Sequence, residues 1–212
     1  MKKVTFLLSF LLLAPLLVTA QDAPVLLNDG YYLIDEEGDT LTKYAYDYIH
    51  PRSGSTWLVI HNSEFNYINP YNYRKISKRS FHSAYPFNGK FGLVGLTPHY
   101  HYISEKGVLF DTLDYALEPK VYGNFLIYGD SVYRVVDVDG TLIHRSTKPL
   151  FIAAKVGIFE WDKAEKRLIQ YSTSARSMRQ VRSFENVDTL AFNHQGYAFI
   201  EQEGKFCVPS AS

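Results

Sequence analysis

The chain has 212 residues with 22 basic and 22 acidic side chains, and its only cysteine is Cys207. A single cysteine excludes an intrachain disulfide, and the balanced charge gives no reason to expect nucleic acid as a partner. We expect Cys207, which lies between Phe206 and Val208, to be a small buried apolar residue.

Residues 1–20 have the pattern of a secretory signal peptide, with two lysines followed by an apolar run from Val4 to Val18. The run is shorter than the roughly 20 residues of a membrane-spanning helix, and no cysteine lies near the expected cleavage site as a bacterial lipoprotein would require. Removing Lys2 and Lys3 leaves 20 basic and 22 acidic residues. We therefore predict an exported protein, periplasmic or secreted from a bacterium, whose residues 21–212 form one domain with no membrane span.

A repeat of about 34 residues runs through the rest of the chain, and each copy is a short apolar run ending in a polar residue and a turn. The branched residue before the polar position falls at 34, 68, 103, 136 and 200, with one degenerate copy expected near Arg167–Gln170. A second pattern, seen in Tyr46-Asp47-Tyr48-Ile49 and Leu113-Asp114-Tyr115-Ala116, keeps the same period. A fixed period of this length indicates units that bury their apolar faces against one another.

Each unit is predicted to be a meander of about three β-strands, because short apolar runs alternate with turn residues. Strands are expected at 56–60, 124–128 and 156–160, while residues 172–182 are the one segment that could form a helical turn. Six such units predict an all-β repeat protein, either propeller-like or an open β-solenoid. We assign Ile34, Ile68, Ile103, Val136 and Ile200 to its core.

These residues resemble the WG (KWG) β-repeat family of bacterial exported proteins. Gly30–Ile49 follows the second half of that family's pattern, and Asn88–Val94 and Lys155–Ile158 look like its Lys-Trp-Gly element with Trp replaced. Neither Trp57 nor Trp161 precedes a glycine, so the Trp-Gly dipeptide itself is degenerate here. The resemblance implies a β-repeat fold and carries no catalytic chemistry.

Glycines in the predicted turns supply the positive φ angles that tight hairpins need. Gly38, Gly107 and Gly140 occupy equivalent places in three copies. Replacing any one of them with Val is therefore predicted to cost a similar stability, on the order of 1–3 kcal/mol.

Two patterns suggest metal ligands, although neither set is complete. Asp137–Thr141 begins like a calcium loop, but Lys148 stands where such a loop needs a bidentate carboxylate. His99 and His101 share a face of a predicted strand, and no third ligand is identified. We predict no metal site and no cofactor, and we interpret Asp137–Thr141 as a repeat turn.

Carboxylates beside an aromatic residue suggest a polysaccharide hydrolase of small β-propeller type as an alternative function. Glu160 and Asp162 flank Trp161, and Asp47 and Asp114 are further candidates. An enzyme would gather two or three of them around one depression with raised pKa values, whereas a binding module would spread them over turns.

Two groups of residues are the predicted contacts for a ligand or partner. A stretch rich in Tyr and Asn contains Tyr67, Tyr71 and Tyr73, and Tyr is suited to contact surfaces because it is rigid and amphipathic. Arg176, Arg179 and Arg182 would share a face if the segment were helical, and could grip an acidic partner or an anionic glycan. With no catalytic motif in the chain, we predict a non-enzymatic module that binds an unidentified protein or glycan in the bacterial envelope.

Overall fold

The computed structural model describes residues 23–27, 29–153, 156–174 and 176–209. Within these residues the protein is all-β, with twenty strands and no helix. The predicted signal peptide lies outside the described residues.

The strands form six small antiparallel sheets, and in each sheet strands that follow one another in the chain are neighbours. The first two sheets are β1 (Ala23–Leu27) with β2 (Gly30–Ile34), and β3 (Tyr48–Ile49), β4 (Trp57–His61) and β5 (Glu64–Ile68). The third sheet contains β6 (Ser83–Asn88), β7 (Phe91–Leu96), β8 (His99–Ser104) and β9 (Leu109–Leu113). The fourth contains β10 (Lys120–Tyr122), β11 (Phe125–Tyr128), β12 (Tyr133–Asp137) and β13 (Leu142–Ser146). The fifth contains β14 (Leu150–Ala153), β15 (Gly157–Asp162), β16 (Arg167–Ser174) and β17 (Ser177–Phe184), and the sixth β18 (Val187–Phe192), β19 (Ala198–Gln202) and β20 (Lys205–Cys207).

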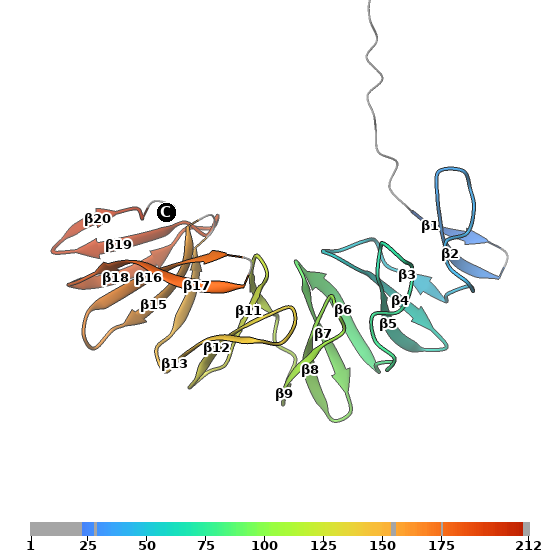
Figure 1. The fold of residues 1–212 in the computed structure, drawn as a ribbon, viewed down its shortest axis with the longest axis horizontal. Coiled ribbons are helices and arrows are strands. Elements are labelled where there is room, and N and C mark those ends of the chain that lie inside the picture. Colours follow the sequence, from blue (N-terminus) through green and yellow to red (C-terminus); the bar gives the residue numbers. More distant parts are fainter. Residues whose placement is uncertain (1–22, 28, 154–155, 175, 210–212) are drawn as a thin grey trace, which may run out of the picture.

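The sheets follow one another in chain order along the longest axis of the molecule (Figure 1). The β1–β2 sheet lies at one end and the β18–β20 sheet at the other, so the described array is open. The sequence predicts units of about three strands, whereas the three sheets between β6 and β17 have four strands each.

The core is divided into five apolar clusters, one between each pair of neighbouring sheets. Leu33 with Trp57 joins the first and second sheets, Leu58 with Val94 the second and third, Leu93 with Leu126 the third and fourth, Ile127 with Ile158 the fourth and fifth, and Leu168 with Ile200 the fifth and sixth. Each large side chain fully buried in this way contributes about 1.5–3 kcal/mol. The apolar contacts between sheets therefore hold the array together.

Inner sheets bury both faces, which explains why their strands are apolar at consecutive positions. In β4, Trp57 and Val59 pack toward the first sheet, whereas Leu58 packs toward the third. In β11, all four residues from Phe125 to Tyr128 are buried. Strands covered on both sides lose the alternation of apolar and polar residues.

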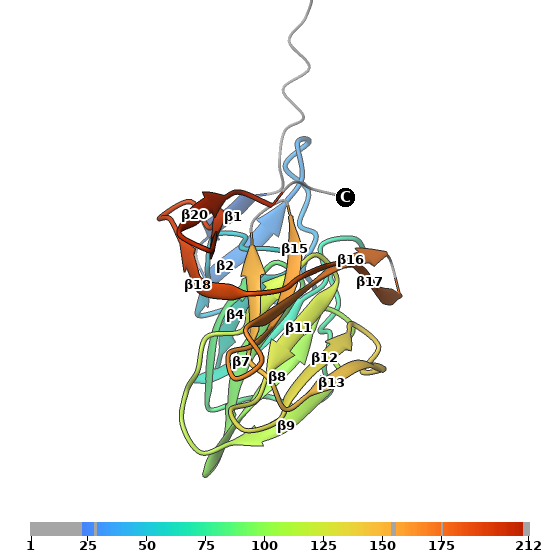
Figure 2. The same ribbon diagram turned by 90° about the vertical axis from the view of Figure 1, so that its left-hand side faces the viewer.

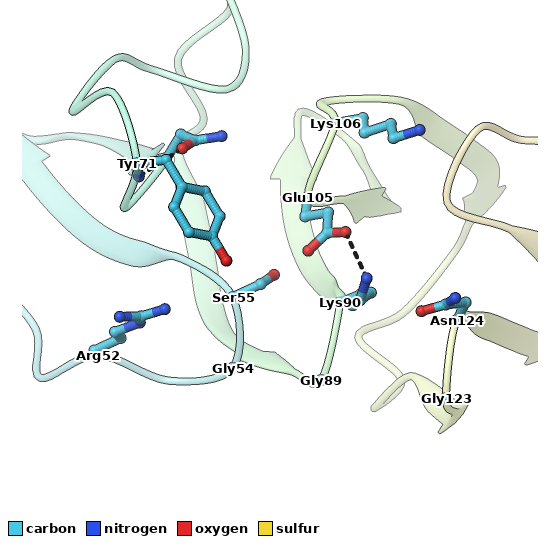
Figure 3. A pocket seen from close by; sticks show the side chains of 11 residues that line it. Arg52, Gly54, Ser55, Tyr71, Gly89, Lys90, Glu105, Lys106, Gly123 and Asn124 are labelled. Atoms are coloured by element: carbon cyan, nitrogen blue, oxygen red, sulfur yellow. Dashed lines mark hydrogen bonds and ion pairs between the residues drawn. The ribbon is translucent and has the colours of Figure 1, made fainter. Parts of the chain in front are cut away.

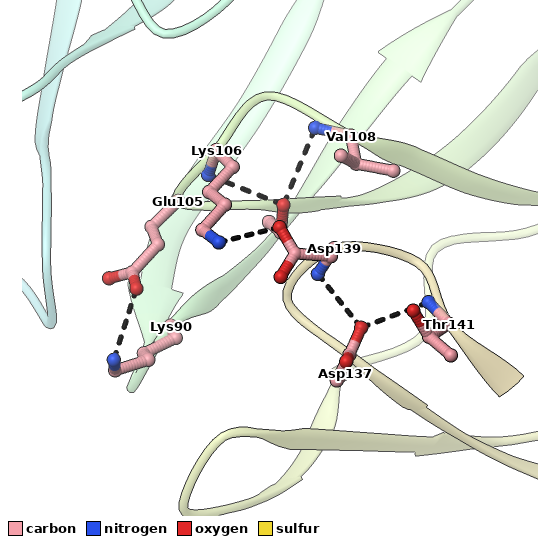
Figure 4. A network of polar contacts seen from close by, with 8 residues as sticks. Lys90, Glu105, Lys106, Val108, Asp137, Asp139 and Thr141 are labelled. Carbon is pink, nitrogen blue, oxygen red and sulfur yellow. Dashed lines mark hydrogen bonds and ion pairs between the residues drawn. The ribbon is translucent and has the colours of Figure 1, made fainter. Parts of the chain in front are cut away.

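The polar residue of the repeat caps its own turn. Asp137 Oδ1 accepts hydrogen bonds from the backbone N–H groups of Asp139 and Thr141, each at 2.9 Å, and Gly140 N donates to Asp137 O at 3.0 Å (Figure 4). This Asx-type turn gives the buried carboxylate its partners. The prediction that Asp137–Thr141 is a repeat turn is confirmed.

The same turn recurs with other capping residues. Ser104 Oγ accepts from the backbone N–H groups of Lys106 and Val108, and Asn193 Oδ1 accepts from those of Gln195 and Tyr197. A short oxygen-bearing side chain at this position is therefore what the turn requires.

Three predictions about single segments are wrong. The described residues between 172 and 182 form no helical turn, because Ser172–Ser174 end β16 and residues 177–182 belong to β17. Cys207 is exposed, since its strand is the outermost of the last sheet. Ile34 is only half-buried and Leu33 takes its place in the core, whereas Ile68, Ile103, Val136 and Ile200 are buried as predicted.

The repeat glycines share a positive φ but have different surroundings. The structure therefore predicts unequal losses of stability when they are replaced with Val, in place of the equal losses expected from the sequence. An added Cβ meets nothing within 4 Å at Gly38, but lies 2.0 Å from Ile76 O at Gly107. We predict that Gly38→Val destabilises the protein by about 1–3 kcal/mol from backbone strain alone, and that Gly107→Val costs clearly more. Urea denaturation of the two variants measures the difference, and equal losses would contradict this account.

Candidate functional site

Three glycine turns meet at one end of the second, third and fourth sheets. Gly54, Gly89 and Gly123 are spaced by 35 and 34 residues and have φ angles of 60°, 59° and 58°. Each precedes a central strand of its sheet, namely β4, β7 or β11. Since the sheets are stacked in order, these turns form one row.

Direct hydrogen bonds join the first two turns of this row, those of Gly54 and Gly89. Ser55 N donates to Gly89 O at 3.0 Å, and Ser53 Oγ donates to Phe87 O at 2.9 Å. A Cβ on Gly54 would lie only 2.3 Å from Gly89 O, so the approach of the two turns needs glycine. The second and third sheets are therefore in close backbone contact at these two turns, whereas an added Cβ at Gly123 would meet nothing within 4 Å.

The row borders an open groove of about 740 Å³, which we call the turn groove (Figure 3). It is lined by Arg52, Gly54, Ser55, Asn69, Tyr71, Gly89, Lys90, Glu105, Lys106, Gly123 and Asn124. The lining contains one aromatic ring and no aliphatic side chain. The lining side chains thus carry mostly amide, hydroxyl and charged groups.

Two of the three cations in the lining are held in ion pairs. Lys90 Nζ lies 3.1 Å from Glu105 Oε1, and Lys106 Nζ lies 2.5 Å from Asp139 Oδ1 (Figure 4). The hydrogen bond from Lys106 holds the pKa of Asp139 below its usual value. Arg52 forms no ion pair with a described residue, so it is the cation most available to a ligand.

The three predicted contact tyrosines have different positions. Tyr71 is 87% exposed and lines the turn groove, as Figure 3 shows. Tyr67 is fully buried and its hydroxyl donates to Tyr85 O at 2.6 Å, so its prediction as a contact residue is wrong. Tyr73 is half-buried, has a positive φ of 55° and packs against the cluster between the first two sheets.

The three predicted contact arginines are exposed, and they lie apart from the groove lining. Their segment is a strand and a turn rather than a helix. The expectation that helical spacing places the three arginines on one face is therefore wrong. Arg179 pairs with Ser172 and Arg182 with Gln170, and a β-bulge lies between these pairs. Because Ser172 and Gln170 are two apart on β16, the register still places Arg179 and Arg182 on one face.

The carboxylates of the hydrolase alternative are held by separate partners. His144 Nε2 lies 2.9 Å from Glu160 Oε2, and this hydrogen bond holds the pKa of Glu160 below its usual value. Lys148 Nζ lies 2.8 Å from Asp162 Oδ2 and likewise lowers the pKa of Asp162. A general acid needs a raised pKa, so these two residues are unsuited to that role.

The other two candidate carboxylates of the hydrolase alternative, Asp47 and Asp114, have partners of their own. Asp47 is exposed and accepts a hydrogen bond from Ser63 N at 3.3 Å, and the side chain of Asp114 is 89% exposed, 3.6 Å from His99 Nδ1. Among the residues that the structure describes, no three His, Cys, Asp or Glu side chains come close enough to hold a metal ion.

Most residues of the turn groove are not predicted as contacts from the sequence. The sequence pattern that could have indicated the groove is a third periodic series of residues, Gly54, Gly89 and Gly123, just before the central strands. Tyr71 is the lining residue that the sequence does predict as a contact. The groove is formed between sheets, so no single copy of the repeat contains it.

Comparison with known proteins gives no family. No family model matches the chain, and no curated protein matches it. Among solved structures, it is similar to a crystal structure of the eukaryotic initiation factor, with 9% identity over 89% of this chain and 59% of that one and a TM-score of 0.41. It is also similar to Kluyvelomyces marxianus Hsv2, at 10% identity over 74% of this chain and 60% of that one (TM-score 0.33), and to a chain of a mitotic checkpoint complex, at 12% identity over 89% and 84% (TM-score 0.33). This chain thus spans less than two thirds of the length of the initiation factor chain and of the Hsv2 chain. At these TM-scores the similarities give no basis for inferring function.

In the described part of the chain, no helix has the length and apolar character needed to cross a membrane.

The Glu160–His144 contact predicts how stability depends on pH. Because the folded pKa of Glu160 lies below its ordinary value near 4.5, the contact stabilises the protein above pH 4.5, and this contribution is lost as the pH falls through the folded pKa. We expect Glu160→Gln to lower the melting temperature at neutral pH and to flatten its fall in acid. Thermal denaturation between pH 7 and pH 3 measures both effects, and an unchanged acid slope would contradict the assignment.

Proposed function

We propose that the protein is an exported, non-enzymatic binding module that holds an anionic glycan in the turn groove. The predicted signal peptide is the support for export, and both export and kinship with the WG repeat family are part of the proposal. The array is best regarded as propeller-like blades in an open row. The observation that carries the function is the lining of the groove.

The groove favours a glycan over a protein segment. Protein contacts are usually anchored by apolar and aromatic side chains in desolvated pockets, and the lining offers no aliphatic side chain and a single aromatic ring, Tyr71. An exposed ring can pack against the C–H face of a sugar, while Asn69 and Asn124 can hydrogen-bond its hydroxyl groups.

The charge of the groove favours an acidic sugar. The lining contains three cations, and two of them are paired, Lys90 with Glu105 and Lys106 with Asp139. Arg52 is the lining cation that has no ion-pair partner among the described residues. The guanidinium of Arg52 can bind a uronate carboxylate with two parallel hydrogen bonds.

The hydrolase alternative receives less support. A glycosidase acts through two carboxyl groups placed on either side of the scissile bond. The groove lining provides only Glu105, which is paired with Lys90. The proposal is therefore binding without cleavage.

The test uses a short oligogalacturonide, with a neutral cello-oligosaccharide of the same length as the uncharged comparison, in isothermal titration calorimetry. We expect the oligogalacturonide to bind more tightly, and Tyr71→Ala to weaken it by about tenfold, which corresponds to roughly 1.4 kcal/mol. Tyr115→Ala, which removes a tyrosine that is 65% exposed outside the groove, should leave the affinity unchanged. Arg52→Gln should weaken binding most at low salt, where charge is least screened.

Failure of the oligogalacturonide to bind, or equal effects of Tyr71→Ala and Tyr115→Ala, would refute a glycan site in the turn groove. Cleavage of the oligosaccharide during the titration would instead support the hydrolase.

A further inference from the structure

The edge strand β17 (Ser177–Phe184) is unusual in this array. It has eight residues, as does its partner β16, and six of its eight residues are exposed. It is the outermost strand of the fifth sheet, and the β16–β17 hairpin extends beyond the body of the array (Figure 2). It therefore presents a long sheet edge that pairs with no further strand, although β17 lies close to β13 and Met178 packs into the cluster between the fourth and fifth sheets.

The backbone of this edge is available for pairing. In an antiparallel ladder, every second residue of an edge strand directs its N–H and C=O groups outward. Among the described residues, no backbone hydrogen bond joins β17 to any element other than β16. The outward groups are positioned to accept one more strand.

The side chains of β17 make this edge positive. Its sequence, SMRQVRSF, contains two arginines and no carboxylate. Neither Arg179 nor Arg182 forms an ion pair with a described residue, and the register places both on one face. Arg182 lies over the Phe184 ring at 5.7 Å, which holds its guanidinium at the surface. Arg176, in the turn before the strand, helps Lys106 to lower the pKa of Asp139.

The same features disfavour pairing with a second copy. Charged side chains and a β-bulge are ways in which proteins prevent edge strands from pairing with one another. Two β17 edges side by side would bring arginines together, and like charges on facing strands are destabilising. An acidic strand would meet no such repulsion.

We propose that β17 is a docking edge to which an extended acidic segment of a partner protein adds as a further strand. Backbone hydrogen bonds provide the attachment, and carboxylates facing Arg179 and Arg182 select the partner. This surface is distinct from the turn groove and goes beyond glycan binding.

The test uses a capped, fluorescently labelled peptide of alternating Glu and Val, matched in length to the eight residues of β17, and measures fluorescence anisotropy with the full chain. A second peptide has the same side chains but N-methyl groups on alternate amides, which keeps the charge and removes the backbone donors. The double variant Arg179→Gln, Arg182→Gln is compared with Arg74→Gln, Arg79→Gln, which removes two exposed arginines elsewhere.

We expect the unmodified peptide to bind, the N-methylated peptide to bind at least about tenfold more weakly, and only the β17 double variant to lose affinity by about tenfold. Hydrogen exchange of the β17 amides should slow when the peptide is bound. Equal binding of the two peptides would overturn strand addition in favour of charge attraction alone, and no binding, or equal losses in the two variants, would overturn the site. Neither result affects the glycan proposal, since the groove residues belong to other sheets.

Discussion

The structure depends on one constraint, which is that a sheet of two to four short strands cannot shield its own faces from water. Each sheet must be covered by the next, and the five clusters between the six sheets show this directly. Leu58 and Val59 are neighbours in one strand, yet they stabilise two different interfaces. Removing one sheet would therefore expose a face on each neighbour.

The same packing creates the candidate site. Stacked sheets bring equivalent turns together, and the 3.0 Å hydrogen bond from Ser55 N to Gly89 O requires the turns to approach without side chains between them. Polar side chains that follow each turn, such as Ser55, Lys90 and Asn124, are then collected along one groove. The packing covers sheet faces but leaves sheet edges free, and β17 is the longest such edge that carries only positive charge.

Part of this was predictable from the sequence. The repeat period follows from comparing copies along the chain. The all-β class, the turn glycines and four of the five core positions follow from local patterns, because each is decided within one copy of the repeat. Tyr67 was not predictable, since its Asn-rich surroundings resemble a surface loop and its hydroxyl partner, Tyr85 O, lies in the next sheet. Cys207 has apolar neighbours in the sequence, but its strand ends the array and no further sheet covers it.

The arginine segment shows a different limit. Arg176, Arg179 and Arg182 have the spacing of a helical face, but Ser172–Ser174 and Ser177–Phe184 pair as strands. The β-bulge between the two pairs restores a shared face for Arg179 and Arg182 by a route that spacing alone does not indicate. Positions set by contacts between copies, or by irregular pairing, required the structure.

Native-state hydrogen exchange across all six sheets tests the open, nearest-neighbour array most directly. In such an array the end sheets have one neighbour and the inner sheets two, so local opening should be easiest at the ends. The account predicts the slowest exchange in β7, β8, β11 and β12, with protection falling toward β1–β2 and β18–β20. Protection of the end sheets equal to that of the central ones would contradict it, since that is the behaviour of a closed ring.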